Sequence, residues 1–196
     1  MGLVLGLLGG VASGKSTVAG LLAARGLLRV DADALAREVV ERPAVRQALA
    51  ERFGADLYDP QGRLDRALLA RRAFADEAST EALNGLVHPA VRAAIAEALD
   101  GAGPRPVVLD VPLLLESPLA GRVDVWVFID ADSGRRDARA ADRDWAPDER
   151  ARREARQASL AEKRAAADHV LENNGDIDDL VEQVDALLER LGIPVS

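Results

Sequence analysis

Five apolar runs are spaced along the chain, and polar or charged segments separate them. The first run, LVLGLL at residues 3–8, is continuous rather than alternating, as is typical of a parallel strand buried on both faces. The remaining runs, each interpreted as a short strand, lie at residues 28–30, 106–111, 123–129 and 169–171. The pattern predicts a buried, five-stranded parallel sheet.

Between these runs, apolar positions recur with a helical period. The clearest periods are at residues 15–25, 89–99 and 177–191. Gly26 stands directly after the first of them, where a C-terminal helix cap is expected. Strands that alternate with helices predict an α/β fold, in which helices flank both faces of the parallel sheet.

Two long segments lack a convincing strand and interrupt this alternation. Several helical patterns follow the second strand, and a charged helical segment, with a joint expected at residues 146–147, separates the fourth strand from the fifth. We therefore expect a core of residues 1–33, 105–131 and 166–196, a helical insertion at residues 34–104, and a second helical segment at residues 132–165.

Composition narrows the classes of protein that this chain could be. Its 196 residues suffice for one core with an insertion, and 48% hydrophobic with 30% charged residues is typical of a soluble globular protein. No run approaches the roughly 18 apolar residues of a membrane span, so we expect a cytoplasmic protein without a membrane partner. Because cysteine is absent, thiolate metal sites are excluded. The net charge of −8 argues against a nucleic-acid partner, and no obligate protein partner is evident.

The turn after the first predicted strand carries a phosphate-loop motif. Gly9, followed after four residues by Gly14, Lys15 and Ser16, satisfies GxxxxGK[ST] between a strand and a helix. The glycines let backbone N–H groups point at phosphate oxygens, and Lys15, one of only two lysines in the chain, supplies a charge for the outer phosphates. We expect ATP or GTP with Mg²⁺, the metal lying on the Ser16 hydroxyl. The residues expected to bind the phosphates are Gly10, Val11, Ala12, Ser13, Gly14, Lys15, Ser16 and Thr17.

The loop alone does not name the reaction. A switch GTPase would carry an Asn-Lys-x-Asp segment, and residues 173–176 resemble it only superficially because they lack the lysine. A transport ATPase would be longer. The helical insertion could hold an acceptor, and the arginine-rich segment could close over the donor phosphates and exclude water. These features favour a kinase of small molecules.

Short motifs extend in one order over nearly the whole chain. They are the phosphate loop, DAD at residues 31–33 with Arg37 downstream, FG at 53–54, GRLDR at 62–66, HP at 88–89, PLLLE at 112–116, Arg139, Arg143, Gln157, Lys163, AD at 167–168 and NNG at 173–175. In these motifs and their order the chain resembles the dephospho-CoA kinase family.

The resemblance implies a P-loop kinase fold and a specific reaction. The γ-phosphoryl group of ATP, with Mg²⁺, would be transferred to the 3′-hydroxyl of the dephospho-CoA ribose, the last step of coenzyme A synthesis. Residues 34–104 would form the substrate domain and residues 132–165 the lid. Two alternatives stay open: another nucleoside or nucleoside-monophosphate kinase, or a non-catalytic nucleotide-binding regulator.

Two aspartates are candidates for the transfer chemistry beside Lys15. Asp33 follows the second strand, where it would orient the acceptor hydroxyl and accept its proton; alternatively, it caps a helix over residues 34–40. Asp110 ends the third strand, where it would be a second magnesium ligand beside Ser16, or a plain strand-end aspartate.

Other candidates are expected at the acceptor. Arg37, one helical turn after Asp33, would hold an acceptor phosphate. His88 is either a substrate contact or a hinge, because the next proline is expected to start a new helix at residue 89. The leucines of the PLLLE motif could fill the core instead, and the family more often has phenylalanine at the last of them. The residues expected to line the acceptor cleft are Pro112, Leu113, Leu115 and Glu116.

Arginines of the predicted lid are the last candidates. Arg139 and Arg143 lie four residues apart, hence on one face of a helix, and in the family such arginines meet the transferring phosphoryl group. The remaining arginines of this segment are expected mostly on a solvated helix surface: Arg135, Arg136, Arg150, Arg152 and Arg153.

Overall fold

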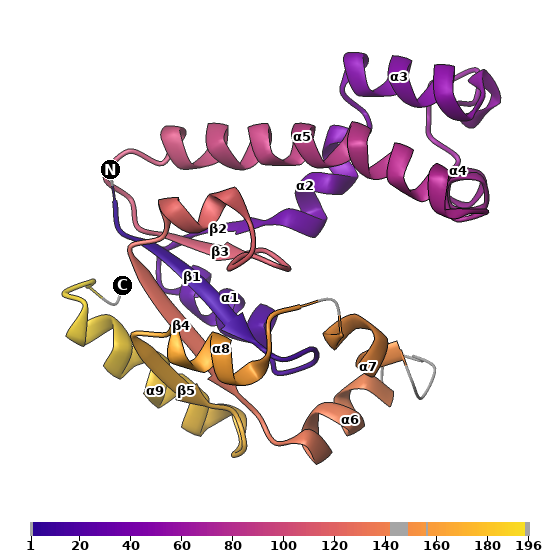
Figure 1. Cartoon of the computed structure of the whole chain (residues 1–196). Coiled ribbons are helices and arrows are strands. Elements are labelled where there is room, and N and C mark those ends of the chain that lie inside the picture. The colour runs from indigo at the N-terminus through magenta and orange to yellow at the C-terminus, as the bar shows by residue number, and fades with distance from the viewer. Residues whose placement is uncertain (1, 142–148, 156, 195–196) are drawn as a thin grey trace. The chain divides into compact units, whose positions relative to one another are not determined.

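The computed structural model describes residues 2–141, 149–155 and 157–194. Their contacts divide the chain into two compact units, one of Met1–Asp31 with Leu99–Ser196 and the other of Ala32–Ala98. The first unit contains the sheet, the phosphate loop and the segment expected as a lid, and the second is helical (Figure 1). Within the described ranges, no helix combines the length and the apolar character that crossing a membrane requires.

A five-stranded parallel sheet forms the first unit, as the apolar runs predict. The strand order is β2-β3-β1-β4-β5, so the loop after β1 leaves from the centre of the sheet. β1 is buried throughout because it pairs with β3 on one side and β4 on the other. The strands are β1 (Val4–Gly9), β2 (Leu28–Asp31), β3 (Val107–Asp110), β4 (Val125–Asp130) and β5 (His169–Glu172).

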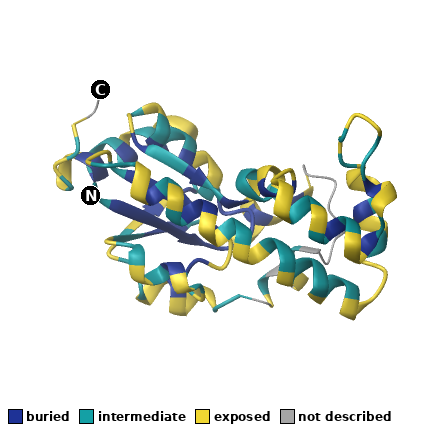
Figure 2. Cartoon of the chain, turned by 90° about the horizontal axis from the view of Figure 1, so that it is seen from above, coloured by how far each residue is buried: buried dark blue, intermediate teal, exposed yellow. Residues whose placement is uncertain are grey.

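Helices cover both faces of this sheet. α1 (Lys15–Ala24) and α9 (Ile177–Arg190) contact each other and join strand side chains in one buried cluster. α8 (Leu160–Ala165) contacts β1 from the opposite face (Figure 1). Figure 2 shows the buried strands between helices whose outer sides are exposed. The unit also contains η2 (Pro118–Arg122), α6 (Ser133–Ala141) and α7 (Glu149–Glu154).

The second unit has its own apolar cluster. Its elements are α2 (Ala32–Val39), α3 (Pro43–Phe53), η1 (Ala55–Leu57), α4 (Arg66–Ala73) and most of α5 (Glu77–Gly101). The cluster is formed by Val40, Leu49, Phe53, Leu57, Leu69 and Ala73. Two arginines fix the chain around it: Arg72 donates to Asp56 and to the carbonyl of Phe53, and Arg66 donates to the carbonyl of Arg37.

The prediction of a helix that starts at Pro89 is wrong, because α5 runs through this residue without a break. Pro89 has no N–H to donate to the carbonyl of Gly85, a loss that costs about 3 kcal/mol inside a helix. Gly85 is exposed, so water can reach that carbonyl. Apolar side chains on both halves of the helix are packed, including Leu86 before the proline and Ile95 after it, and this packing outweighs the local cost.

Candidate active site around the phosphate loop

The loop between β1 and α1 has the backbone that its glycines predict. Gly9 and Gly14 have φ angles of 149° and 100°, in a region that side chains disfavour. A Cβ added at Gly14 would lie 2.1 Å from Nδ2 of Asn173, so a larger residue does not fit there. α1 begins at Lys15 directly after Gly14, and its first N–H groups point out of the helix toward the loop. This arrangement is a cradle for an anion.

Lys15 is folded back onto the loop. Its Nζ lies 3.2 Å from the carbonyl oxygen of Gly9 and 2.9 Å from that of Gly10. The neighbouring Ser16 and Thr17 are exposed, while Ser13 is buried. The Oγ of Ser13 has no hydrogen-bond partner among the described residues. The Lys15 ammonium group therefore lies at the mouth of the loop and donates hydrogen bonds to two carbonyl oxygens. The oxygens of a bound phosphate would replace these carbonyls as its acceptors.

One flank of the loop is held by two donors on the carbonyl of Ser13. Asn173 follows β5 and is buried, and its Nδ2 donates to this carbonyl at 2.7 Å. Arg139 of α6 donates to the same oxygen at 3.2 Å and to the backbone and side-chain oxygens of Asn173 at 3.1 Å. A cavity of about 370 Å³ opens beside them, and its lining includes Thr17, Gly175 and Ile177.

The flank of the loop at Val11 is held by a carboxylate. Glu154 of α7 accepts the N–H of Val11 at 3.1 Å, and it also accepts hydrogen bonds from the guanidinium groups of Arg136 and Arg150. Arg136 is only 6% exposed, and its Nε donates to the carbonyl of Ala131 at 3.0 Å. The expectation that Arg136 lies on a solvated surface is thus wrong, because α6 turns it inward together with the buried Ala140, one helical turn later. Arg143 lies outside the described residues.

Two aspartates meet at the end of the sheet. Asp31 on β2 stands opposite Asp110 on β3, and Arg29 bridges them with Nη2 at 2.9 and 2.7 Å from their carboxylates. Asp110 is 9% exposed, so Arg29 compensates a nearly buried charge. Among the described residues no group of three or more acidic or histidine side chains could hold a metal ion. Oδ1 of Asp110 and the exposed hydroxyl of Ser16 still suit Mg²⁺, which takes few protein ligands beside phosphates and water.

Asp33 lies in the first turn of α2, in the second unit. The interpretation of Asp33 as a helix cap is wrong, because β2 passes directly into α2 and the helix begins at Ala32, before the aspartate. The exposed carboxylate is stabilised there by the positive end of the helix. Arg37 is also exposed and lies one turn later on the same face, whereas His88 is exposed on α5.

The PLLLE segment after β3 turns its leucines in different directions. Leu114 is buried, whereas Leu113 is 43% exposed and has a φ of 57°, so Leu113 does not fill the core. Leu115 is half-buried and Pro112 is exposed. Glu116 accepts the backbone N–H of Ala158, in the segment between α7 and α8. This motif therefore contacts the segment expected as the lid.

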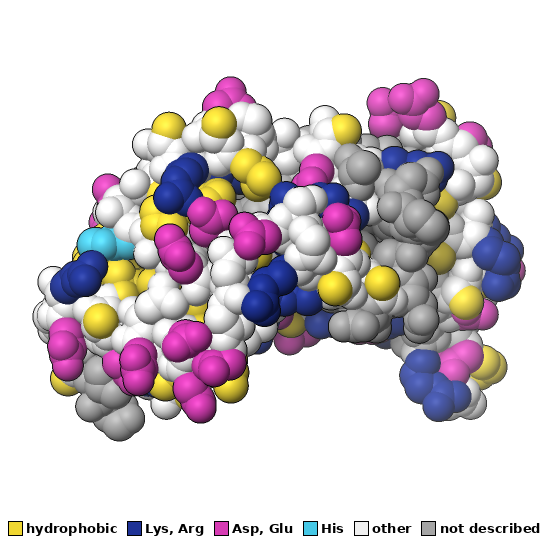
Figure 3. Space-filling model, turned by 90° about the horizontal axis from the view of Figure 1, so that it is seen from below, with side chains coloured by type: hydrophobic (Ala, Val, Ile, Leu, Met, Phe, Trp, Pro, Cys, Tyr) yellow, Lys and Arg dark blue, Asp and Glu magenta, His cyan; other side chains and the backbone are white. Residues whose placement is uncertain are grey.

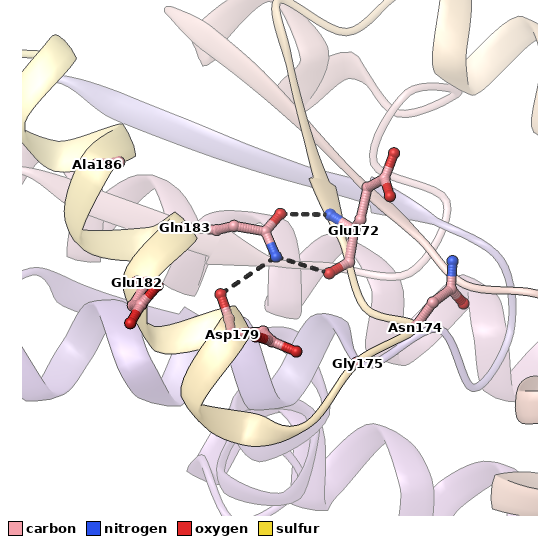
Figure 4. Close-up of a pocket in the computed structure, with 7 residues that line it drawn as sticks. All are labelled: Glu172, Asn174, Gly175, Asp179, Glu182, Gln183 and Ala186. Carbon is pink, nitrogen blue, oxygen red and sulfur yellow. Dashed lines mark hydrogen bonds between the residues drawn. The ribbon is translucent and has the colours of Figure 1, made fainter.

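A second cavity, between β5 and α9, has an acidic lining. It has a volume of about 520 Å³ (Figure 4). Gln183 points toward β5, where it bonds both the N–H and the carbonyl of Glu172. Three carboxylates line this cavity, so an anionic phosphate would be repelled there.

On the face shown in Figure 3, Lys and Arg side chains lie among Asp and Glu side chains rather than in one continuous patch.

Comparison with known proteins decides the family. A family model described as dephospho-CoA kinase matches residues 3–179. The chain belongs to the dephospho-CoA kinase family. A dephospho-CoA kinase of Thermobifida fusca is 43% identical over 196 residues and 96% of each chain is covered. The crystal structure of TT1252 from Thermus thermophilus is similar with a TM-score of 0.77 and 36% identity, covering 97% of this chain and 98% of that one. Dephospho-CoA kinase from Campylobacter jejuni, 19% identical with a TM-score of 0.70 and 96% of each chain covered, shares the fold.

In this member of the dephospho-CoA kinase family, only some of the residues expected at the site lie together around the phosphate loop. Arg139 reaches the loop, although it contacts the Ser13 carbonyl rather than an open anion site. Sequence reasoning missed the roles of Asn173, Arg136 and Glu154. The NNG motif was a signal for Asn173, whereas an arginine and a glutamate in a charged helix give none.

Proposed function

We propose that this kinase transfers the γ-phosphoryl group of ATP to the 3′-hydroxyl of the dephospho-CoA ribose, giving coenzyme A and ADP. The observation that carries the proposal is the phosphate loop, with Lys15 at its mouth, in a chain of the dephospho-CoA kinase family. The transfer is direct and in line, without a covalent enzyme intermediate. As in other P-loop kinases, catalysis then rests on positioning and on charge stabilisation.

The donor nucleotide would use the loop and the cavity beside it. Its phosphates would bind the N–H groups of residues 10–17, and Lys15 would turn from the carbonyls of Gly9 and Gly10 to the outer phosphates. The cavity lined by Arg139 and Asn173 adjoins Thr17, so it is suited to the base and ribose. Ser16 and Asp110 would hold Mg²⁺, which would supply charge stabilisation for the transferred group.

Each unit by itself contains residues that we propose for acceptor binding. Asp33 is the proposed base for the 3′-hydroxyl, because it is an exposed carboxylate at the start of α2. Arg37 would hold an acceptor phosphate on the same helix face, with His88 as a further contact. Exposed Leu113 and half-buried Leu115 would contact apolar parts of the acceptor, with Pro112 and Glu116 beside them. Residues 132–165 would act as the lid that excludes water, with Arg139 and Arg143 on the phosphoryl group.

One assay separates this function from the alternatives. Purified protein with Mg-ATP is given dephospho-CoA, adenosine, AMP or no acceptor, and ADP formation is followed. Among these acceptors, we expect rapid ADP formation only with dephospho-CoA. Faster turnover with adenosine or AMP would make the protein a different small-molecule kinase, and ATP binding without turnover on any acceptor would make it a non-catalytic binder.

The role of Asp33 needs its own variant. Asp33→Asn keeps the size of the side chain but removes the basic oxygen, so kcat should fall at least about a hundredfold while ATP binding is unchanged. Asp59→Asn, an exchange in the same unit, is the control. An unchanged kcat in Asp33→Asn would leave Asp33 with a structural role only.

A further inference from the structure

Glu154 brings a carboxylate to a loop that is built for anions. Its Oε1 accepts the N–H of Val11 at 3.1 Å and a hydrogen bond from Nη1 of Arg136, and its Oε2 accepts Nη1 of Arg150 at 2.7 Å. Three N–H donors therefore converge on one carboxylate. One of them belongs to the phosphate loop itself.

The donors around Glu154 are fixed independently of it. Arg136 is buried and is anchored by its Nε to the carbonyl of Ala131. A Cβ added at Gly10 would come within 2.6 Å of Nη1 of Arg136 and within 3.1 Å of Oε1 of Glu154, so both groups lie directly against the loop backbone. Guanidinium groups and a loop N–H are also the donors that bind phosphoryl oxygens in phosphate-transfer sites.

We propose that Glu154 occupies, in the nucleotide-free protein, the place of the terminal phosphoryl group of a bound nucleoside triphosphate, and that the nucleotide displaces it. The inference rests on the proposed function because it takes this loop as the donor site. The N–H groups at the start of α1 would hold the inner phosphates, whereas Val11 lies in the loop itself, four residues before α1 begins. The terminal phosphoryl group then accepts the hydrogen bonds from Val11, Arg136 and Arg150 that Glu154 accepts in the nucleotide-free protein.

Competition of this kind lowers the affinity for triphosphates in particular. Displacement of Glu154 weakens the binding of a ligand only if the ligand occupies the position of the terminal phosphoryl group. The affinity for a diphosphate is therefore lowered much less. Glu154 thereby sets the balance between binding of ATP and binding of ADP. It is not a catalytic residue in this proposal, since it leaves before the reacting group arrives.

The test compares Glu154→Gln with the wild type by calorimetric binding of Mg-ADP and of a non-hydrolysable ATP analogue. Glutamine keeps the side-chain length but loses the charge that holds two guanidinium groups. The analogue should bind about five- to tenfold more tightly and ADP less than about twofold more tightly. Glu154→Asp, which keeps the charge but is one carbon shorter, should give an intermediate gain and serves if the glutamine variant does not fold.

Asp137→Asn is the matched control. Asp137 accepts Nε of Arg150 at 2.6 Å, so the exchange removes the same charge and a bond to the same arginine. It should leave the ratio of the two affinities unchanged. A fall in analogue affinity in Glu154→Gln, an equal shift for both nucleotides, or the same shift in Asp137→Asn would each overturn the proposal. Normal nucleotide binding without transfer to dephospho-CoA would instead overturn the proposed function. The binding comparison between the two nucleotides would still test the role of Glu154.

Discussion

The two flanks of the phosphate loop are held by opposite chemistry. On the Ser13 flank, Asn173 and Arg139 donate hydrogen bonds to a loop carbonyl. On the Val11 flank, Glu154 accepts a hydrogen bond from a loop N–H. Both flanks use an arginine of α6, because Arg136 and Arg139 lie nearly one turn apart on that helix.

The difference matters because the expected ligand is an anion. An anion accepts hydrogen bonds from N–H groups, so it cannot replace a group that donates a hydrogen bond to a carbonyl oxygen. The hydrogen bond from Asn173 to the Ser13 carbonyl can therefore persist when the nucleotide binds, and it shapes the loop in advance. The Val11 flank, by contrast, consists of groups that the ligand itself can use, so we infer that it rearranges.

The largest effect is expected at Lys15, between the flanks. Lys15→Ala removes the charge proposed for the outer phosphates, and kcat should fall at least about a hundredfold. ADP formation with saturating dephospho-CoA measures the change. Arg190→Ala, which removes an exposed charge at the end of α9, is the control and should keep wild-type turnover. A Lys15→Ala enzyme within threefold of the wild type would remove the loop from the mechanism.

The Ser13 flank is tested by Asn173→Ala. This exchange deletes a buried donor and leaves the Ser13 carbonyl with Arg139 alone, which should cost about 1–3 kcal/mol of folding stability. Urea unfolding measures this loss. Affinity for both ADP and the ATP analogue should fall together, because the loop loses its preformed shape. Asn174→Ala, which removes the amide acceptor for the N–H of Asp132 instead, should leave the affinities unchanged. A selective loss of analogue affinity in Asn173→Ala would contradict the division between the flanks.

The sequence predicts the fold and the loop much better than the loop's surroundings. Continuous apolar runs and the spacing of glycines are local signals, and strands such as β1 begin and end within about two residues of their predicted bounds. The continuity of α5 through Pro89 was missed because packing in the tertiary structure outweighs a local helix breaker. Glu154 was missed for a related reason: a carboxylate 143 positions from Val11 has no sequence pattern that joins the two.

The smallest predicted effect concerns Lys163, which the Val11 flank influences. Its Nζ is buried and donates to Oε1 of Gln157 at 2.6 Å. Burial lowers the pKa of Lys163 below its ordinary value of 10.5, and the charges of Glu116 and Glu154 partly oppose this. Between the lowered pKa and 10.5, the unfolded chain binds a proton that the folded protein lacks. The free energy of unfolding should therefore rise with pH in this window relative to Lys163→Met, which cannot titrate.

Urea unfolding of the wild type and Lys163→Met from pH 7 to about pH 10 measures this difference, and parallel curves would show that Lys163 titrates as if exposed. Glu154→Gln then sharpens the comparison. Without the Glu154 carboxylate the pKa of Lys163 should fall further, so the rise in stability should begin at a lower pH. Asn173→Ala should leave the onset where it is, because Asn173 carries no charge and contacts the Ser13 flank. If both variants moved the onset equally, the flanks would be coupled through the loop rather than held separately.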